Sequence, residues 1–320
     1  MVGLGALNID HLYRVRQILA DGETVTEQSK SSPGGSAANT IYGLAKLGVK
    51  AGFIGAIGSD AEGKIMLRSF QKVGVDTSQI NIKQGASTGS VFCLIDKQGR
   101  RSLYVSPGAN NLLDIDDVDL DYIKQSKLLH ISSFVDDRQF KLNLQLIEKL
   151  LGNQPSSHLK GVKLSFSPGA LYVAKGFNTL APILAHTHTL FLNRDEIKQL
   201  TGKEFPTGAK TCLEAGCQIV AVTLGKGIKC KNKIATSYIR DKEGEYLIEQ
   251  SSPVTVRDTT GAGDAFATGF LYGLLNSKGL VKCGRLGDIV ARFVISKMGA
   301  REGLPTLAQL AKRYQELYPD

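Results

Sequence analysis

Short apolar runs alternate with stretches of helical periodicity along most of the chain. VGLGAL (residues 2–7) and AGFIGAIG (residues 51–58) have strand length, and each precedes a segment whose apolar residues recur every three or four positions. The alternation returns later in SKLLHISSF and FKLNLQLIEKLLG, in HTLFLN and RDEIKQLTG, and in the strand-like runs GVKLSFSPG and CQIVAVTLG. Repeated βα units predict a doubly wound α/β fold, with a mainly parallel sheet and helices on both faces.

Two segments depart from this alternation. Residues 12–33 are polar and strand-like, and residues 86–107 have the pattern of a hairpin that turns at residues 97–99. Together they predict a small β lid over the strand ends, where such folds bind ligands, although a surface decoration has the same pattern. A further hairpin at residues 233–250 is expected to close one edge of the main sheet. Because no Pro-rich linker interrupts the chain, we expect a single domain over residues 1–320.

Composition narrows the class of protein. The 320 residues are 42% hydrophobic and 22% charged, as in soluble globular proteins. The net charge of +9 is spread without a dense Lys/Arg block, so we predict no nucleic-acid partner. Five scattered cysteines lack zinc or redox spacing, which indicates reduced thiols. With no secretory signal and no apolar run of membrane-spanning length, we expect a cytoplasmic protein without a membrane partner.

Two glycine patterns imitate nucleotide-binding motifs. Gly3 and Gly5 open a possible dinucleotide fingerprint, but Asn8 stands where its third glycine is needed. GSDAEGKI has the glycine spacing of a P-loop and includes Lys64, yet Ile65 replaces the Ser or Thr that would reach Mg²⁺. Neither motif is complete, so we predict neither a nicotinamide site nor an NTPase P-loop.

The stretch DTTGAGDAF combines small residues with an acid at a predicted helix start. Gly261, Ala262 and Gly263 leave room for an anion beside the unpaired N–H groups and positive dipole of the first turn. Such a turn suits phosphoryl transfer, in which negative charge develops on the moving group. Asp264, which the helix end should keep ionised, could take the proton of an attacking hydroxyl as a general base. The alternative is an ordinary helix start.

Several motifs together resemble one enzyme family. VRDTTGAGDAFATGFLYGLL resembles the C-terminal signature of the ribokinase-like (PfkB) carbohydrate kinases, and PGGSAANTIYGLAKLG with GAIGSDAEGK resembles their N-terminal signature. GALNIDH, SPGANN, NRDE, VTLGKG and KMGAREGLP follow in family order, so the resemblance spans essentially the whole chain. It implies an ATP- and Mg²⁺-dependent kinase that phosphorylates an alcohol, on the fold and with the lid predicted above.

The resemblance also assigns roles to individual residues. Asp264 matches the catalytic base, and the positions that match the anion hole are Gly261, Ala262 and Gly263. The acceptor-binding positions are Asn8, Asp10, Gly34, Gly35, Ser36 and Asn39. The ATP-side positions are Asn193, Thr223, Gly225 and Gly227, with Glu196 organising Mg²⁺ through water. Asp258 and Thr260 match positions where relatives hold a monovalent cation such as K⁺.

Residue chemistry agrees with some of these roles and leaves others open. Carboxylate and amide groups are the partners that sugar hydroxyls require, and Asn8, Asp10 and Asn39 supply both. Capping of a turn or strand end is an alternative for Asn8 and Asp10. Asn193 and Glu196 also have the spacing of a helix capping box. Capping is compatible with a role on the ATP side of the site.

The acceptor remains open between two branches of the family. Ser36 stands where ribokinases have Lys, and GGSAAN is more similar to nucleoside kinases. NIDH and SPGAN are more similar to ribokinases, so the sequence predicts phosphorylation of a hydroxymethyl group on a pentose, a hexose or a nucleoside. The alternative is a non-catalytic sugar- or nucleotide-responsive binding protein on the same fold. Free lid edges would suit pairing of two copies into a homodimer.

Overall fold

A large, mostly parallel sheet forms the centre of the protein in the computed structural model, which describes residues 1–98, 100–152, 161–230, 233–250 and 253–319. All neighbours from β11 to β5 are parallel, and β12 and β13 add an antiparallel hairpin at one edge, as predicted. The order across the sheet is β13 (Glu245–Glu249), β12 (Lys233–Asp241), β11 (Ile219–Cys230), β10 (Thr187–Asn193), β9 (Lys163–Ser167), β8 (Leu128–Ser132), β1 (Val2–Leu4), β4 (Gly52–Gly58) and β5 (Ile80–Lys83).

Helices follow most of the parallel strands. Those of the first half are α1 (Ser36–Lys46), α2 (Ala61–Lys72), α3 (Leu120–Lys124) and α4 (Asp137–Leu151), with short 3₁₀ turns at Gly108–Leu112 and Ile115–Asp117. Those of the second half are α5 (Gly169–Val173), α6 (Phe177–Leu184), α7 (Arg194–Thr201), α8 (Phe205–Glu214), α9 (Ala262–Leu275), α10 (Leu280–Ile295) and α11 (Leu307–Leu317).

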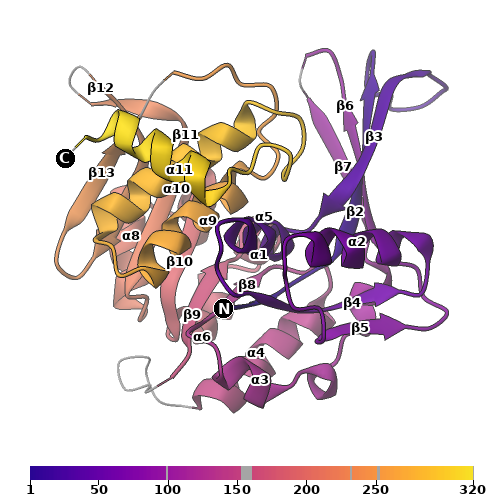
Figure 1. Cartoon of the computed structure of the whole chain (residues 1–320), viewed down its shortest axis with the longest axis horizontal. Helices are drawn as coiled ribbons and strands as arrows, with labels where there is room; N and C mark the ends of the chain where they lie inside the picture. The colour runs from indigo at the N-terminus through magenta and orange to yellow at the C-terminus, as the bar shows by residue number, and fades with distance from the viewer. Residues whose placement is uncertain (99, 153–160, 231–232, 251–252, 320) are drawn as a thin grey trace.

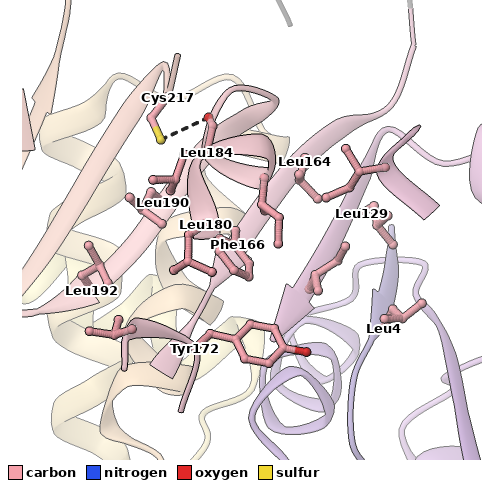
Figure 2. Packing of buried hydrophobic residues seen from close by; sticks show 14 of the residues in the cluster. Leu4, Leu129, Leu164, Phe166, Tyr172, Leu180, Leu184, Leu190, Leu192 and Cys217 are labelled. Atoms are coloured by element: carbon pink, nitrogen blue, oxygen red, sulfur yellow. Dashed lines mark hydrogen bonds between the residues drawn. The ribbon is translucent and has the colours of Figure 1, made fainter. Parts of the chain in front are cut away.

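Both faces of the sheet are buried under helices. Successive residues of one strand point to opposite faces, so Leu190 and Leu192 pack into one core while Phe191 packs into the other. The first core contains residues of α3 to α8 and is shown in Figure 2, and the second contains residues of α1, α2, α9 and α10. The predicted doubly wound, mainly parallel fold is therefore confirmed.

A second, four-stranded sheet projects from the molecule beside α2, at the upper right of Figure 1. Its first strand begins at Asn8 rather than at residue 12, so the predicted acceptor-binding residues Asn8 and Asp10 lie within it. The hairpin expected at residues 86–107 is present, although residue 99 of its turn lies outside the described residues. The order is β3 (Thr26–Gly34), β2 (Asn8–Val15), β6 (Gly89–Ile95) and β7 (Arg101–Ser106).

Close packing of α9 against two helices fixes the position of its N-terminus. A Cβ at Gly43 of α1 would lie 2.7 Å from the Thr268 side chain, and a Cβ at Gly269 would overlap the Leu286 carbonyl of α10. Glycine at both positions lets the helix axes approach. Within the described residues, no helix has the length and apolar character needed to cross a membrane.

Candidate functional site

The N-terminus of α9 has the geometry expected for an anion site. Gly261 caps the helix with φ 72°, a left-handed conformation that favours glycine. The first i→i−4 bond runs from Ala265 N to Gly261 O at 2.9 Å, so the N–H groups of Gly263 and Asp264 belong to the unpaired first turn. No atom lies within 4 Å of a Cβ placed on exposed Gly263. A phosphate oxygen can therefore approach this turn.

The Asp264 carboxylate joins α9 to α1. Ser36 donates a hydrogen bond of 2.7 Å from Oγ to Oδ1, and Asn39 donates one of 2.9 Å from Nδ2 to Oδ2. Burial raises the pKa of Asp264 above its ordinary value, while these two hydrogen bonds and the positive charge of Arg301 oppose the shift. The helix end was expected to favour ionisation, but desolvation has the larger effect on the pKa.

A cavity of about 150 Å³ lies between this carboxylate and the carboxyl ends of β10 and β11. Its position at the strand ends agrees with the general placement of ligand sites in doubly wound sheets. Predicted acceptor-side and ATP-side residues therefore face one small space. The predicted site residues that line it are Ser36, Asn193, Glu196, Thr223, Gly263 and Asp264.

Asn193 and Glu196 form the capping box of α7 that their spacing indicated. Glu196 N donates to Asn193 Oδ1 and Asn193 N donates to Glu196 Oε2, both at 2.8 Å. Burial raises the pKa of Glu196, and the charges of Asp195 and Asp264 raise it further. Two mutually unfavourable carboxylates at one cavity fit a bound divalent cation, which would stabilise both ionised forms.

The predicted acceptor-binding residues Asn8 and Asp10 lie at the start of β2 in the smaller sheet. Asn8 is almost completely buried, and its Oδ1 accepts a 2.9 Å hydrogen bond from Asn110 Nδ2. Asp10 lies two residues further along β2, where burial raises its pKa to about 7, opposed by Arg301 and reinforced by Asp264. Sequence reasoning missed Asn110, although it belongs to the SPGANN motif.

The glycine pair makes the turn from β3 into α1. A side chain at Gly34 would overlap the Asp10 carboxylate, and one at Gly35 would overlap the Ala6 carbonyl. Gly35 also has φ 97° and caps α1, so both steric space and backbone conformation require glycine there. The pair thus lets Asp10 and the start of α1 meet.

Gly225 and Gly227 lie farther from the cavity than expected. Thr223 lines the cavity, but the two glycines, with φ 60° and 86°, occupy the irregular stretch of β11 beyond it. The register between β11 and β12 shifts between Thr223 and Ile228. Neither glycine lines the cavity, and a side chain at Gly227 would overlap Ile234.

Asp258 and Thr260 belong to a separate hydrogen-bonded loop. Asp258 Oδ1 accepts hydrogen bonds from Thr260 N at 2.9 Å and Thr260 Oγ1 at 2.7 Å. Asp258 Oδ2 accepts one of 2.8 Å from Gly299 N, which ties this loop to the segment after α10. Across the described residues, no group of three His, Cys, Asp or Glu side chains is placed to hold a metal ion.

Arg301 is a site residue that sequence reasoning missed. Its Nε donates a 2.8 Å hydrogen bond to Asn39 Oδ1, and its guanidinium lies 4.9 Å from the centre of the Tyr42 ring. Burial lowers the pKa of Arg301 to about 10, which leaves it charged at neutral pH. The residue stands in a loop whose local sequence, KMGAREGLP, does not indicate contact with helix α1.

The incomplete P-loop is a structural turn. Asp60 caps α2 through a 2.8 Å hydrogen bond from Gly63 N, and its other oxygen accepts one of 2.7 Å from Thr88 N. The acidic side chain thus occupies the space in which a P-loop would hold phosphate. This agrees with the rejection of an NTPase loop.

Comparison with known proteins then decides the family, since the profile of the pfkB family carbohydrate kinases matches residues 1–307. The chain belongs to this family. It is 38% identical to an uncharacterized sugar kinase of Archaeoglobus fulgidus over 82% of this chain and 98% of that protein. It is 30% identical to the ribokinase of Haemophilus influenzae over 95% of this chain and 94% of that protein.

A solved structure supports the fold. The crystal structure of ribokinase from Thermotoga maritima has a TM-score of 0.80, with 24% identity and 98% of each chain covered. The chain is thus a pfkB-type, ATP-dependent carbohydrate kinase with the ribokinase fold, as the sequence motifs predicted. Kinases of this kind use ATP and typically a divalent metal ion.

Proposed function

We propose that this kinase transfers the γ-phosphoryl group of ATP to a hydroxymethyl group of a small sugar or nucleoside, with Asp264 as the general base. The observation that carries the proposal is the dual position of the Asp264 carboxylate. It accepts hydrogen bonds from Ser36 and Asn39, which belong to the acceptor motif, and it lines one cavity with Glu196 on the ATP side.

The reaction needs one proton transfer and one in-line displacement. Asp264 accepts the proton of the acceptor hydroxyl, whose oxygen forms a bond to the γ-phosphorus while the bond to the ADP oxygen breaks. We assign the anion hole for the charge that develops on the transferred group to the turn of Gly261, Ala262 and Gly263. Within this turn, Ala262 N also donates a 3.2 Å hydrogen bond to Thr259 O. The raised pKa of Asp264 makes it a stronger base than an ordinary carboxylate.

On the ATP side, four residues and one metal position complete the site. We assign Mg²⁺ to Glu196, with contact through water, and the nucleotide to Asn193, Thr223, Gly225 and Gly227. Bound Mg²⁺ supplies charge neutralisation for the phosphates. Bound Mg²⁺ would favour the ionised form of Glu196, which burial and the charges of Asp195 and Asp264 disfavour. Asp258 and Thr260 are assigned to a monovalent cation, K⁺, that would fix the loop before α9.

The acceptor is assigned to the region where β2, β3 and α1 meet, next to the cavity that Ser36 and Asp264 line. Asn8 and Asp10 supply an amide and a carboxylate for sugar hydroxyls, and Gly34 lets the backbone of β3 lie directly beside the Asp10 carboxylate. Ser36 contacts Asp264 and is far shorter than the Lys of ribokinases. A larger acceptor, such as a nucleoside, would therefore have room, while ribose or fructose would bind with water filling the remainder. The acceptor side chains assigned to this region are Asn8, Asp10, Ser36 and Asn39.

We propose that the smaller sheet of β2, β3, β6 and β7, which includes strands of the lid predicted at residues 12–33 and 86–107, acts as a lid and as a dimerisation surface. As a lid it would exclude water that competes for the phosphoryl group.

The edge strand β7 of this sheet exposes Leu103 and Tyr104, at 59% and 60%, beside Val105. An apolar free edge favours strand pairing, so a second copy is the expected partner. Sedimentation of the wild-type protein and of Tyr104→Lys measures the oligomeric state of each. The substitution should favour monomers.

The first experiment measures ADP release from ATP and Mg²⁺ with ribose, fructose, ribose 1-phosphate, adenosine, inosine and cytidine. At least one acceptor should be turned over, and Asp264→Asn should lower kcat for it by about 10²- to 10⁴-fold. Asp121→Asn, which changes an exposed carboxylate of α3, serves as the control and should leave kcat unchanged. Chelation of divalent ions should abolish turnover by the wild-type enzyme and by Asp121→Asn.

Two results would contradict this proposal. Full turnover by Asp264→Asn would remove the general-base role. ATP binding by calorimetry without turnover of any acceptor in the panel would favour the non-catalytic binding protein instead.

A further inference from the structure

We propose that Arg301 is a positioning residue for Asp264, which it orients through the side-chain amide of Asn39. The inference rests on the proposed role of Asp264 as the general base. Arg301 lies between α10 and α11, remote in sequence from Asn39 in α1. Its Nε donates to Asn39 Oδ1 at 2.8 Å, and Asn39 Nδ2 donates to Asp264 Oδ2 at 2.9 Å. The three side chains thus form a continuous chain of hydrogen bonds.

The chemistry of the three groups permits one orientation of the amide. A guanidinium group only donates hydrogen bonds, and an ionised carboxylate only accepts them. An amide between them must therefore point its oxygen to Arg301 and its NH₂ to Asp264. Without Arg301 the amide could rotate by 180° and place its oxygen against the carboxylate, which would lose the hydrogen bond and repel the base.

Arg301 is itself held from several directions. Its two terminal nitrogens donate to Ser69 Oγ at 3.1 Å and to the Gly34 carbonyl oxygen at 3.2 Å. The guanidinium lies 4.9 Å from the ring centre of Tyr42 and 5.4 Å from that of Phe70, within reach of cation–π attraction. Contacts with α1, α2 and β3 therefore fix its position, as a positioning residue requires.

The positive charge of Arg301 also acts on Asp264 electrostatically, in addition to orienting it. Its hydrogen bonds go to neutral oxygens, and the acids that face it are Asp10 from β2 and Asp264 from α9, with the Tyr42 phenol on α1. Arg301 lowers the pKa of both acids against the opposing effect of burial. Glu196 of α7 lines the same cavity as Asp264, and burial together with the charge of Asp264 raises the pKa of Glu196. Because Arg301 lowers the pKa of Asp264, it favours the ionised base that the reaction needs.

Substitution at Arg301 separates positioning from packing. Arg301→Met keeps an unbranched chain against Tyr42 but removes the charge and all donors. With ATP, Mg²⁺ and the most active acceptor of the panel above, kcat should fall by about 10- to 100-fold, while KM for ATP stays within about twofold of wild type. Ser69→Ala is the matched control, because it removes one contact of Arg301 and leaves the bond to Asn39 intact.

A double-mutant cycle tests the route through Asn39. In an Asn39→Ala background, Arg301→Met should cost less than about threefold in kcat, because the amide it orients is gone. An equal cost in both backgrounds would overturn the inference, as would an Arg301→Met enzyme with wild-type kcat. If Arg301→Met does not fold, Arg301→Lys takes its place in the cycle, with the same coupling to Asn39 required.

A second readout does not depend on turnover. The ¹³C resonance of the Asp264 carboxyl, assigned by its loss in Asp264→Asn, should titrate at higher pH in Arg301→Met than in wild type or Ser69→Ala. An unchanged midpoint would overturn the inference even if no acceptor were known. The two proposals can be contradicted separately. An active Asp264→Asn enzyme would contradict the proposed function. An inactive Asp264→Asn enzyme together with a fully active Arg301→Met enzyme would contradict only the role of Arg301.

Discussion

Ser36 Oγ in α1 donates a 2.7 Å hydrogen bond to Asp264 Oδ1 in α9, across 228 positions of sequence. The contact joins the first turns of two helices that pack closely because Gly43 faces Thr268. A short polar side chain at position 36 thus contacts the proposed base itself, where ribokinases have a long cationic one. The two family signatures meet at this bond.

Loss of the Ser36 hydroxyl should weaken catalysis. A hydrogen bond to a charged group contributes about 1.5–3 kcal/mol, so Ser36→Ala should lower kcat by about tenfold or more. Since Ser36 lowers the pKa of Asp264, the acidic limb of the kcat profile should also move to higher pH. Ser126→Ala, outside the site, is the control for steady-state assays from pH 5 to 9. A Ser36→Ala enzyme with the wild-type profile would show that the bond is incidental.

Acceptor binding should depend on pH through Asp10. Its folded pKa is about 7, so roughly a tenth of the molecules carry the carboxylate at pH 6 and nine tenths at pH 8. Because the ionised form is the better partner for sugar hydroxyls, KM for the acceptor should fall by up to about tenfold between these values. Asp10→Asn should show a higher KM with a flat profile. The same slope in Asp10→Asn would assign the effect to another group.

Buried His130 should make the protein less stable in mild acid. Its Nδ1 bonds Ser165 Oγ at 2.9 Å, and complete burial lowers its pKa to about 3 from 6.5. Below pH 6.5 the unfolded chain therefore binds more protons than the folded protein. The free energy of unfolding decreases as the pH is lowered from 6.5 to about 3. This residue alone should reduce the free energy of unfolding by about 2 kcal/mol between pH 7 and pH 5.

Denaturant titrations at both pH values measure this effect. His130→Gln should lose that part of the pH dependence, whatever its effect on stability at pH 7. If the variant and wild type lost equal stability on acidification, the contribution of His130 would be disproved.

Gly269 should be intolerant of a single methyl group. A Gly-to-Ala change inside a helix normally stabilises by about 0.5–1 kcal/mol, but a Cβ here would overlap the Leu286 carbonyl. Gly269→Ala should therefore reduce the free energy of unfolding by about 1–3 kcal/mol. Gly161→Ala is the control, because no atom lies within 4 Å of a Cβ placed there and the residue stands outside any helix. A more stable Gly269→Ala protein would show that α9 and α10 can separate at no cost.

Local patterns predicted the main sheet well because its strands and helices follow one another in sequence. The runs around Leu164, Leu190 and Val220 became the neighbouring strands β9, β10 and β11 without any long-range information. The start of the smaller sheet was less predictable. Asn8 follows the apolar run of β1 directly, so the pattern did not separate the two strands, and the pairing of Asn8 with Gly34 sets the boundary only in three dimensions.

The candidate site divides in the same way. Asp264, Asn193 and Glu196 stand at helix starts that the sequence identifies, and the structure brings Asp264 and Glu196 to one cavity. Arg301 and Asn110 act through contacts with distant segments. Arg301 stands in the family-like stretch KMGAREGLP, but a loop arginine has no periodicity that indicates its partner, so its contact with Asn39 became visible only in the structure.

Strand β2 begins at Asn8, carries Asp10 and continues outward as part of the smaller sheet, and β3 returns along it to Gly34. The proposed acceptor contacts and the outer sheet are therefore parts of the same two strands. Any displacement of that sheet as a rigid unit changes the acceptor contacts with it, so sheet position and acceptor occupancy are thermodynamically linked. Substitutions near the exposed ends of β2 and β3 would then change acceptor affinity from a distance, and an acceptor analogue would report on where the sheet lies.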